Sequence, residues 1–128
     1  VGAESAHFLA QMHKHVTIVE MKDVIAEDAA VGPRKHLLKA LQEREVNMLT
    51  GVKVTSVTAK GVVIVDQNGQ EAELHADTIV VAVGSKAYNP LEEQLKALHI
   101  PVKVVGDAKQ VAKVIEATRS GYVAGRDI

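Results

Sequence analysis

Two residues near the start of the chain have the types and the spacing that could bind a nucleotide. Gly2 opens a helix-like run, and Glu20 ends the apolar strand that follows it, 16–20. Free N–H groups at a helix N-terminus bind phosphate, and a carboxylate at the end of the next strand accepts hydrogen bonds from ribose hydroxyls. The spacing fits the last glycine and the acid of a G-x-G-x-x-G βαβ signature, whose first strand and first two glycines are missing here.

Both residues also have a plainer interpretation, which the sequence leaves open. Gly2 is then a glycine without a structural duty, and Glu20 is a solvent-facing acid at the end of a strand. If Glu20 does bind ribose, it repels a 2′-phosphate and favours NADH over NADPH. Because most of the phosphate loop is missing, we do not expect this chain by itself to bind NAD strongly.

Composition narrows the functional class mainly by exclusion. A net charge of −1 gives no electrostatic reason to expect nucleic acid or an anionic membrane as a partner. The chain has no cysteine, so disulfides, thiolate catalysis and cysteine-ligated clusters are excluded from these 128 residues. The six histidines show no metal-ligand spacing, and no nucleophile elbow is present. No apolar run is long enough to span a membrane and no leader is visible, so we expect a cytoplasmic protein with no membrane partner.

The order of expected elements is that of an α/β chain. Residues 2–13 should form a helix, with Phe8, Leu9 and Met12 on its apolar face, and a second helix should follow Pro33. The strands expected in the first three quarters of the chain are 16–20, 47–50, 52–58, 62–65, 71–75 and 76–84. The last of these is almost wholly apolar, which predicts burial on both faces. Asn68-Gly69 predicts a tight two-residue hairpin turn.

The remaining elements are two helices and one strand. A helix should start at Asn89-Pro90, a strand should span 102–105, and a closing helix should carry Val111, Val114 and Ile115. Asp107 lies between that strand and the closing helix, where Asp is a preferred N-cap residue.

Four blocks of sequence resemble one known family. They are Gly2–Ala6, Val16–Met21, Ile79–Ser85 with Asn89, and Val104–Ala108. In this order they resemble the pyridine-nucleotide domain of flavoprotein NADH:flavin oxidoreductases of the 2,4-dienoyl-CoA reductase and trimethylamine dehydrogenase type. One departure concerns the third block, because the family usually places proline just before the asparagine, whereas Pro90 follows Asn89 here.

The resemblance implies a three-layer Rossmann-like fold of the FAD/NAD(P)-binding class. Its central parallel sheet carries helices on one face and a β-meander on the other, and its first strand is missing here. Residues 1–100 would form the NADH-binding domain, and 101–128 a return segment similar to the Gly-Asp strand and helix of the flavin- or ADP-binding domain. A flavin-carrying barrel domain would precede the chain in the parent protein.

The resemblance also implies functional roles. NADH would dock across Gly2, Glu4, Glu20 and Gly84 and pass a hydride to FAD or FMN, while Asp107 would bond a flavin or ADP hydroxyl. We expect no catalytic residue and no metal ligand in the chain, which alone should not be catalytic. The plainer alternatives are a first-turn acid for Glu4, a turn glycine for Gly84 and the helix cap for Asp107, and for Asp107 the cap is favoured.

A second functional class remains open beside the oxidoreductase. The chain could be a non-catalytic module that binds an adenine nucleotide such as ADP, or a structural interface. The missing strand also leaves unpaired backbone in the sheet, which is a hazard for pairing with other strands. We therefore expect residues 102–105 to occupy that position, either from the same chain or by exchange within a strand-swapped homodimer.

Overall fold

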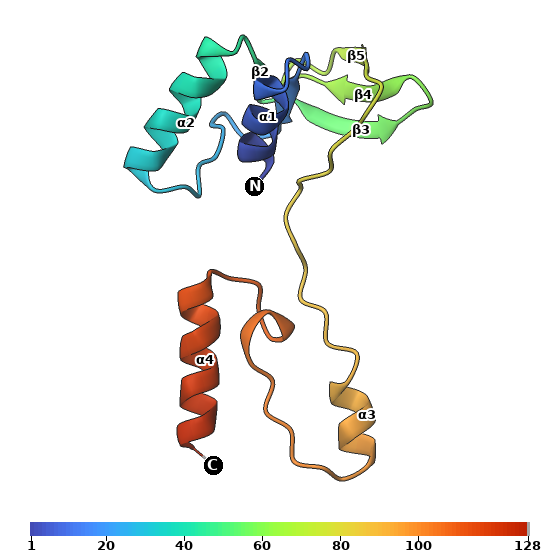
Figure 1. Cartoon of the computed structure of the whole chain (residues 1–128). Coiled ribbons are helices and arrows are strands. Elements are labelled where there is room, and N and C mark those ends of the chain that lie inside the picture. Colours follow the sequence, from blue (N-terminus) through green and yellow to red (C-terminus); the bar gives the residue numbers. More distant parts are fainter. Residues whose placement is uncertain (128) are drawn as a thin grey trace. The chain divides into compact units, whose positions relative to one another are not determined.

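The computed structural model describes residues 1–127, which divide into two compact units, the first spanning Val1–Val83 and the second beginning at Gly84 (Figure 1). The elements of the first unit are α1 (Gly2–Gln11), β1 (Thr17–Glu20), α2 (Val31–Glu43), β2 (Asn47–Thr50), β3 (Lys53–Val57), β4 (Gly61–Val65) and β5 (Glu71–His75). Those of the second are α3 (Glu92–Ala97), the short 3-10 helix η1 (Gly106–Ala108) and α4 (Val114–Arg126).

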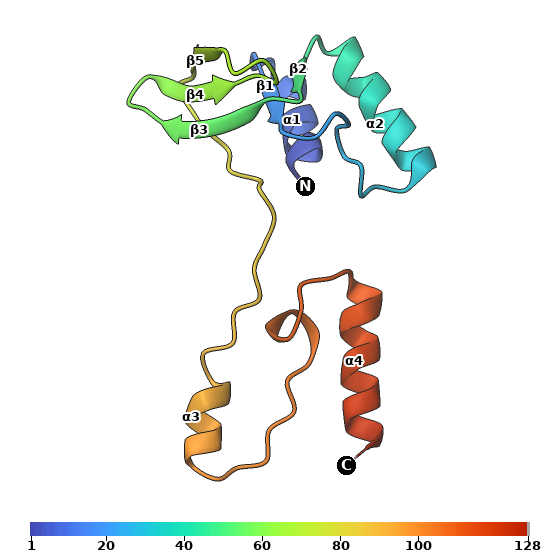
Figure 2. The ribbon, with the colours of Figure 1, turned by 180° about the vertical axis from the view of Figure 1, so that it is seen from behind.

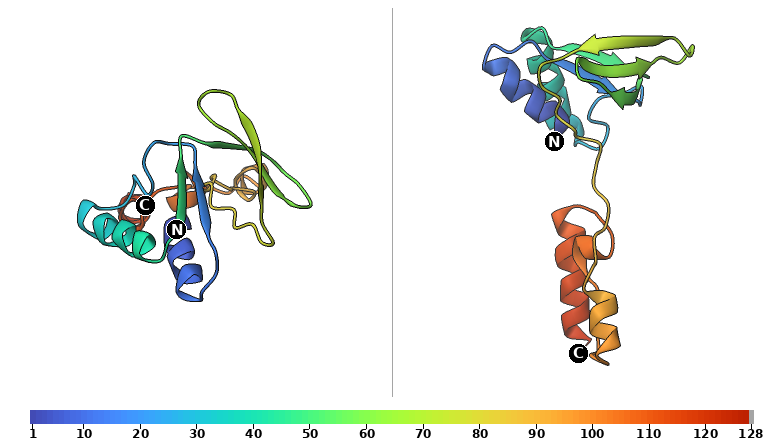
Figure 3. Two further views of the ribbon diagram at one scale, coloured as in Figure 1. Left: turned by 90° about the horizontal axis from the view of Figure 1, so that it is seen from above. Right: turned by 90° about the vertical axis from the view of Figure 1, so that its right-hand side faces the viewer.

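The first unit combines a parallel pair of strands with an antiparallel sheet. β1 pairs with β2 in parallel, with Thr17 opposite Asn47 and Glu20 opposite Thr50. α1 and α2 lie on one side of this pair, and the β3–β5 meander lies on the other (Figure 3). The predicted α/β class, with a parallel sheet, helices and a meander, is therefore confirmed.

The core of the first unit lies between the two helices and the parallel pair. Its most buried members are Ala6 and Ala10 of α1, Leu41 of α2, and Val46 just before β2. The apolar face predicted for α1 was wrong for Phe8 and Met12, which are 60% and 54% exposed, whereas Leu9 is half-buried. The alanines face the core instead, since side chains this small let α2 approach α1 closely.

The meander follows the predicted strands closely. β4 is the central strand, antiparallel to both β3 and β5, and its Val62 and Ile64 are buried. A bulge interrupts the β3–β4 register between Val54 and Ser56. The turn at Asn68-Gly69 is longer than predicted: Asp66 accepts the N–H of Gly69 at 3.1 Å, and only Gly69 of the two residues has a positive φ.

Two predicted strands do not form. Residues 76–84 have no strand pairing, and Val81 and Val83 are 72% and 90% exposed rather than buried. Residues 102–105 form no strand, and the strands of both sheets within residues 1–127 all come from the first unit. Both segments are rich in β-branched residues, but a strand exists only where a neighbour satisfies its backbone groups, and within residues 1–127 neither segment has one.

In the second unit, the segment that holds residues 103–106 runs beside α4 (Figure 2) and is hydrogen-bonded to it. Ser120 accepts the N–H of Gly106 at 2.8 Å, and the Lys103 ammonium donates to the carbonyl oxygens of Ala124 and Asp127 at 3.2 and 2.8 Å. A cation at the last carbonyls of a helix also complements its dipole. α4 begins at Val114, so the predicted closing helix starts later than Val111. None of the helices within residues 1–127 has the length and apolar character needed to cross a membrane.

Candidate nucleotide-binding site

The carboxyl ends of β1 and β2 form the edge at which the candidate site lies. Glu20 and Thr50 are paired at this edge, because the strands are parallel and in register. α1 precedes β1 by a short turn and packs against it, so helix and strand run in opposite directions. The first turn of α1, which carries Gly2, therefore lies toward the edge where β1 ends. Ligands of open α/β sheets bind at such edges.

Two backbone N–H groups hold Glu20 at this edge by hydrogen bonds. Its carboxylate Oε1 accepts the N–H of Lys22 at 3.0 Å, and its carbonyl oxygen accepts the N–H of Val52 at 3.1 Å. The residue is half-buried, and no hydrogen bond within residues 1–127 engages its second carboxylate oxygen, Oε2. One oxygen thus fixes the orientation of the carboxylate, and the other remains able to accept a hydroxyl.

The loop after β1 is anchored to the rest of the unit at several points. The carbonyl oxygen of Lys22 accepts the N–H of Gly51 at 3.0 Å, and Asp23 Oδ1 accepts the Gln67 amide at 2.9 Å. Gln67 belongs to the β4–β5 turn, so the meander holds this edge. Sequence reasoning missed Gln67 and Asp23, because 44 positions separate them and neither is part of a recognisable motif.

Gly2 has a structural role that the sequence alone did not establish. A methyl group at this position would lie 2.9 Å from the Cβ of Ala82, which is closer than side-chain carbons approach. Glycine therefore lets the start of α1 lie against the 76–83 segment. Glu4, in the same first turn, is exposed, and its carboxylate lies 3.2 Å from the Val1 amino nitrogen.

Gly84 and Asp107, the other two predicted site residues, belong to the second unit. Gly84 has φ +92°, a left-handed conformation that favours glycine, but residues 76–83 before it form no strand for a turn to terminate. The cap interpretation of Asp107 was wrong. Lys113 is the N-cap of α4, whereas Asp107 lies in η1 and accepts the N–H of Ala112 at 3.4 Å. The cap was misplaced because the sequence does not show that six residues separate Asp107 from the first turn of α4.

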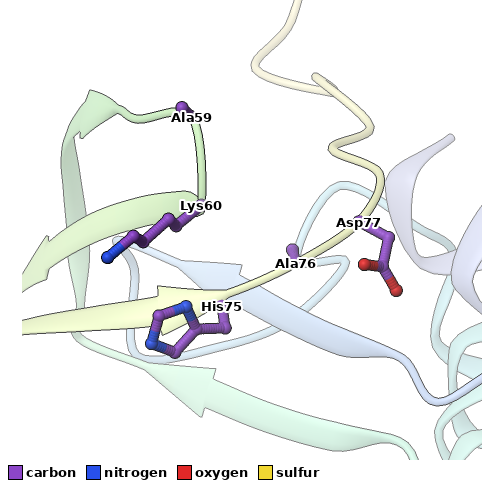
Figure 4. A pocket seen from close by; sticks show the side chains of 5 residues that line it. All are labelled: Ala59, Lys60, His75, Ala76 and Asp77. Atoms are coloured by element: carbon purple, nitrogen blue, oxygen red, sulfur yellow. The ribbon is translucent and has the colours of Figure 1, made fainter.

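Two surface cavities lie outside this edge. One, of about 510 Å³, is formed where the β3–β4 turn meets the end of β5, and Lys60, His75 and Asp77 contribute polar side chains (Figure 4). In this view Asp77 is turned away from the other two. The second, of about 830 Å³, lies in the second unit between residues 102–109 and α4. Across residues 1–127, no three His, Asp or Glu side chains converge as metal ligands would.

Comparison with known proteins identifies the family. The model of the family described as pyridine nucleotide-disulphide oxidoreductase matches residues 1–112. The chain belongs to this family. It contains no cysteine, so the disulphide of the family's name has no counterpart in these 128 residues.

Characterised relatives are oxidoreductases. The chain is 37% identical to an NADH oxidase of Thermoanaerobacter brockii over 123 residues, which are 95% of this chain and 19% of the relative. It is 34% identical to a bilirubin reductase of Mediterraneibacter gnavus over 97% of this chain and 19% of the relative. The chain thus spans about a fifth of the length of these relatives. The resemblance of the four sequence blocks to flavoprotein oxidoreductases is confirmed.

Solved structures agree on the fold. A complex of 2-naphthoyl-CoA reductase matches 98% of this chain and 19% of its own, with a TM-score of 0.84 and 27% identity. Histamine dehydrogenase from Rhizobium sp. 4-9 matches all of this chain and 21% of its own, with a TM-score of 0.89. Its identity of 19% shows likeness of fold alone.

Proposed function

We propose that this chain is the NADH-binding part of a longer flavin-dependent oxidoreductase, in which NADH passes a hydride to FAD or FMN. The observation that carries the proposal is the position of Glu20. Its carboxylate ends β1 at the edge toward which the first turn of α1 points, and one of its oxygens is free of hydrogen bonds within residues 1–127. A family match over residues 1–112 supports the same assignment.

The residues present at this edge fit part of a dinucleotide. Glu20 Oε2 would accept the adenosine ribose hydroxyls, and the N–H groups of the first turn of α1 would face the pyrophosphate. Gly2, where a side chain would fill the space beside Ala82, would keep backbone and ligand close. The dinucleotide supplies the hydride and the flavin accepts it, so this chain contributes binding and orientation rather than a catalytic residue.

Three further roles belong to the same proposal. Glu4 would lie toward the nicotinamide end of NADH, Gly84 would let the backbone approach the dinucleotide, and Asp107 would bond a flavin or ADP hydroxyl. Residues 1–100 would then serve NADH and 101–128 the flavin or ADP side, with the substrate site in a preceding barrel domain. Because the substrate would be reduced in that barrel domain, we expect this chain by itself to have no enzymatic activity.

A calorimetric titration of the chain with NADH and with ADP, at high nucleotide concentration, tests the proposal. We expect weak binding, tighter for NADH than for ADP. Glu20→Gln should weaken NADH binding roughly tenfold, the factor for losing a hydrogen bond to a charged group. Equal binding of ADP and NADH would instead favour the alternative of an adenine-nucleotide module. Binding of neither would overturn both of these assignments and leave the structural interface.

Glu43→Gln is the matched control for this titration. It also removes one carboxylate charge, but from the end of α2, where Glu43 pairs with Lys39 at 3.6 Å. α2 leads into the start of β2, so this pair lies toward the edge opposite Glu20. We expect unchanged NADH affinity in Glu43→Gln; an equal loss in both variants would mean that Glu20 acts only through net charge.

A further inference from the structure

The loop between β1 and α2 places a cation next to the ribose-binding acid. Lys22 follows Glu20 by two residues, and its backbone N–H bonds the Glu20 carboxylate at 3.0 Å. A lysine on its four-carbon stem at this position is well placed to contact a group attached to the ribose 2′ oxygen. Lysine also binds phosphate as a compact point charge.

The ammonium of Lys22 is nevertheless already engaged. Its Nζ donates to Glu27 Oε2 at 2.6 Å, in an exposed ion pair. The hydrogen bond to Glu27 is also the main reason that the pKa of Lys22 is raised, and the same bond chiefly lowers the pKa of Glu27. Glu20 and Asp28 add further negative potential around Lys22, and Arg34 lies near Glu27.

The backbone of the loop is arranged to bring Glu27 to Lys22. Ala26 has φ +52°, a left-handed conformation that costs a non-glycine residue on the order of 1 kcal/mol and persists only where the surroundings impose it. Ile25 on one side is buried, and its carbonyl oxygen accepts the Arg34 Nε–H at 2.8 Å. Buried side chain and anchored carbonyl therefore fix the turn from which Glu27 points back along the loop.

We propose that Glu27 is a positioning residue that makes this site discriminate against NADPH by holding the Lys22 ammonium away from the ribose 2′ position. With Lys22 neutralised by Glu27, an incoming 2′-phosphate meets the Glu20 carboxylate without a compensating cation. This inference rests on the proposed binding of NADH at Glu20 and adds a second determinant of cofactor choice, which acts through Lys22.

The ratio of NADPH to NADH affinity tests this inference. Both nucleotides are titrated into the chain, and binding is followed by amide chemical shifts, which report weak association. In Glu27→Gln we expect NADPH to bind roughly fivefold more tightly at low salt, with NADH affinity changed by less than twofold. The gain should shrink as salt is added, because the freed charge is exposed.

Three variants separate a positioning role from a change of net charge. Lys22→Gln combined with Glu27→Gln should lose the gain, since the cation that Glu27 releases is then absent. Glu27→Asp, which keeps the charge on a shorter side chain, should restore most of the discrimination. Glu43→Gln breaks the Lys39–Glu43 ion pair and should leave the ratio unchanged.

The outcomes distinguish this inference from the proposed function. If NADH binds and shifts Glu20 but Glu27→Gln leaves the ratio unchanged, the role of Glu27 is refuted while the proposed function stands. If the double variant keeps the whole gain, Lys22 is not the group that Glu27 restrains, and the inference is again refuted. If neither nucleotide binds, the proposed function fails and this inference fails with it.

Discussion

Replacing Leu41 with alanine should remove a large part of the stability of the first unit. Leu41 is fully buried, with 0% exposure, and it joins α2 to α1 through Ala6 and Ala10. Loss of a buried leucine side chain costs about 2–5 kcal/mol, depending on how far the site collapses. The two facing alanines have no side-chain rotamers with which to fill the cavity, so we expect about 3–4 kcal/mol, in the upper part of that range.

This cost is large for a unit of this kind. The core cluster around Leu41 has only three other buried members, Ala6, Ala10 and Val46, within residues 1–127. Domains are stable by about 5–15 kcal/mol in total, so the loss of Leu41 removes a major fraction. Urea unfolding followed by circular dichroism should show it directly, because a slope of about 1–2 kcal/mol per molar urea converts the loss into a midpoint lower by roughly 2 M.

Leu98→Ala provides the chemically matched control. Leu98 is 69% exposed, so the same truncation should change stability by less than about 0.5 kcal/mol. A cost below about 1 kcal/mol for Leu41→Ala would refute the packing of α2 on α1 from which the edge at Glu20 is built.

Three further predictions follow from particular contacts. Gly2→Ala should lower the free energy of unfolding of the first unit although alanine favours helix, because the added methyl group would crowd Ala82. Gly121→Ala in α4, where the space is open, should instead raise the free energy of unfolding. Urea unfolding that shows changes of the same sign in both variants would contradict this prediction. Hydrogen bonds, chiefly from the Gln70 N–H, lower the pKa of Asp66. The stability that these bonds add to the folded state should therefore be complete above about pH 4 and decrease below it. Asp66→Asn should remove this part of the pH dependence of stability, and a pH dependence equal to that of the unchanged chain would contradict the turn geometry. Within residues 1–127, no third strand is hydrogen-bonded to β1 or β2, which leaves strand edges open to pairing with a second copy. We therefore expect analytical ultracentrifugation to show a concentration-dependent dimer made by exchange of residues 102–105. A monomer at every concentration would exclude this exchange.

Local patterns predicted the elements that depend on local rules. The alternation and turn residues of 52–75 gave the meander, and the apolar run ending in Glu20 gave β1, because register and turn chemistry are encoded nearby. Residues 76–84 have the composition of a buried strand, but pairing depends on a neighbour that composition does not reveal. The same limit applied to α1, where large apolar residues predicted the buried face and small alanines occupy it.

For the candidate site too, the sequence pattern predicted one residue but not the contacts that hold it. Glu20 was recognisable because a strand-end acid has a fixed place in the βαβ pattern. The contacts around Glu20 could not be recognised from the sequence. Gln67 bonds Asp23 from a distant part of the chain, and Glu27 contacts Lys22 only because of the left-handed turn at Ala26. Such partners are set by tertiary geometry rather than by spacing.

The most direct test of the central claim is a map of backbone amide shifts in this chain as NADH is added. We predict that the largest changes occur in the first turn of α1, from Gly2 to Ser5, and at Glu20 to Lys22 where β1 ends. Shifts concentrated in the 66–70 turn or along α4, with the Glu20 edge unchanged, would contradict nucleotide binding at this edge.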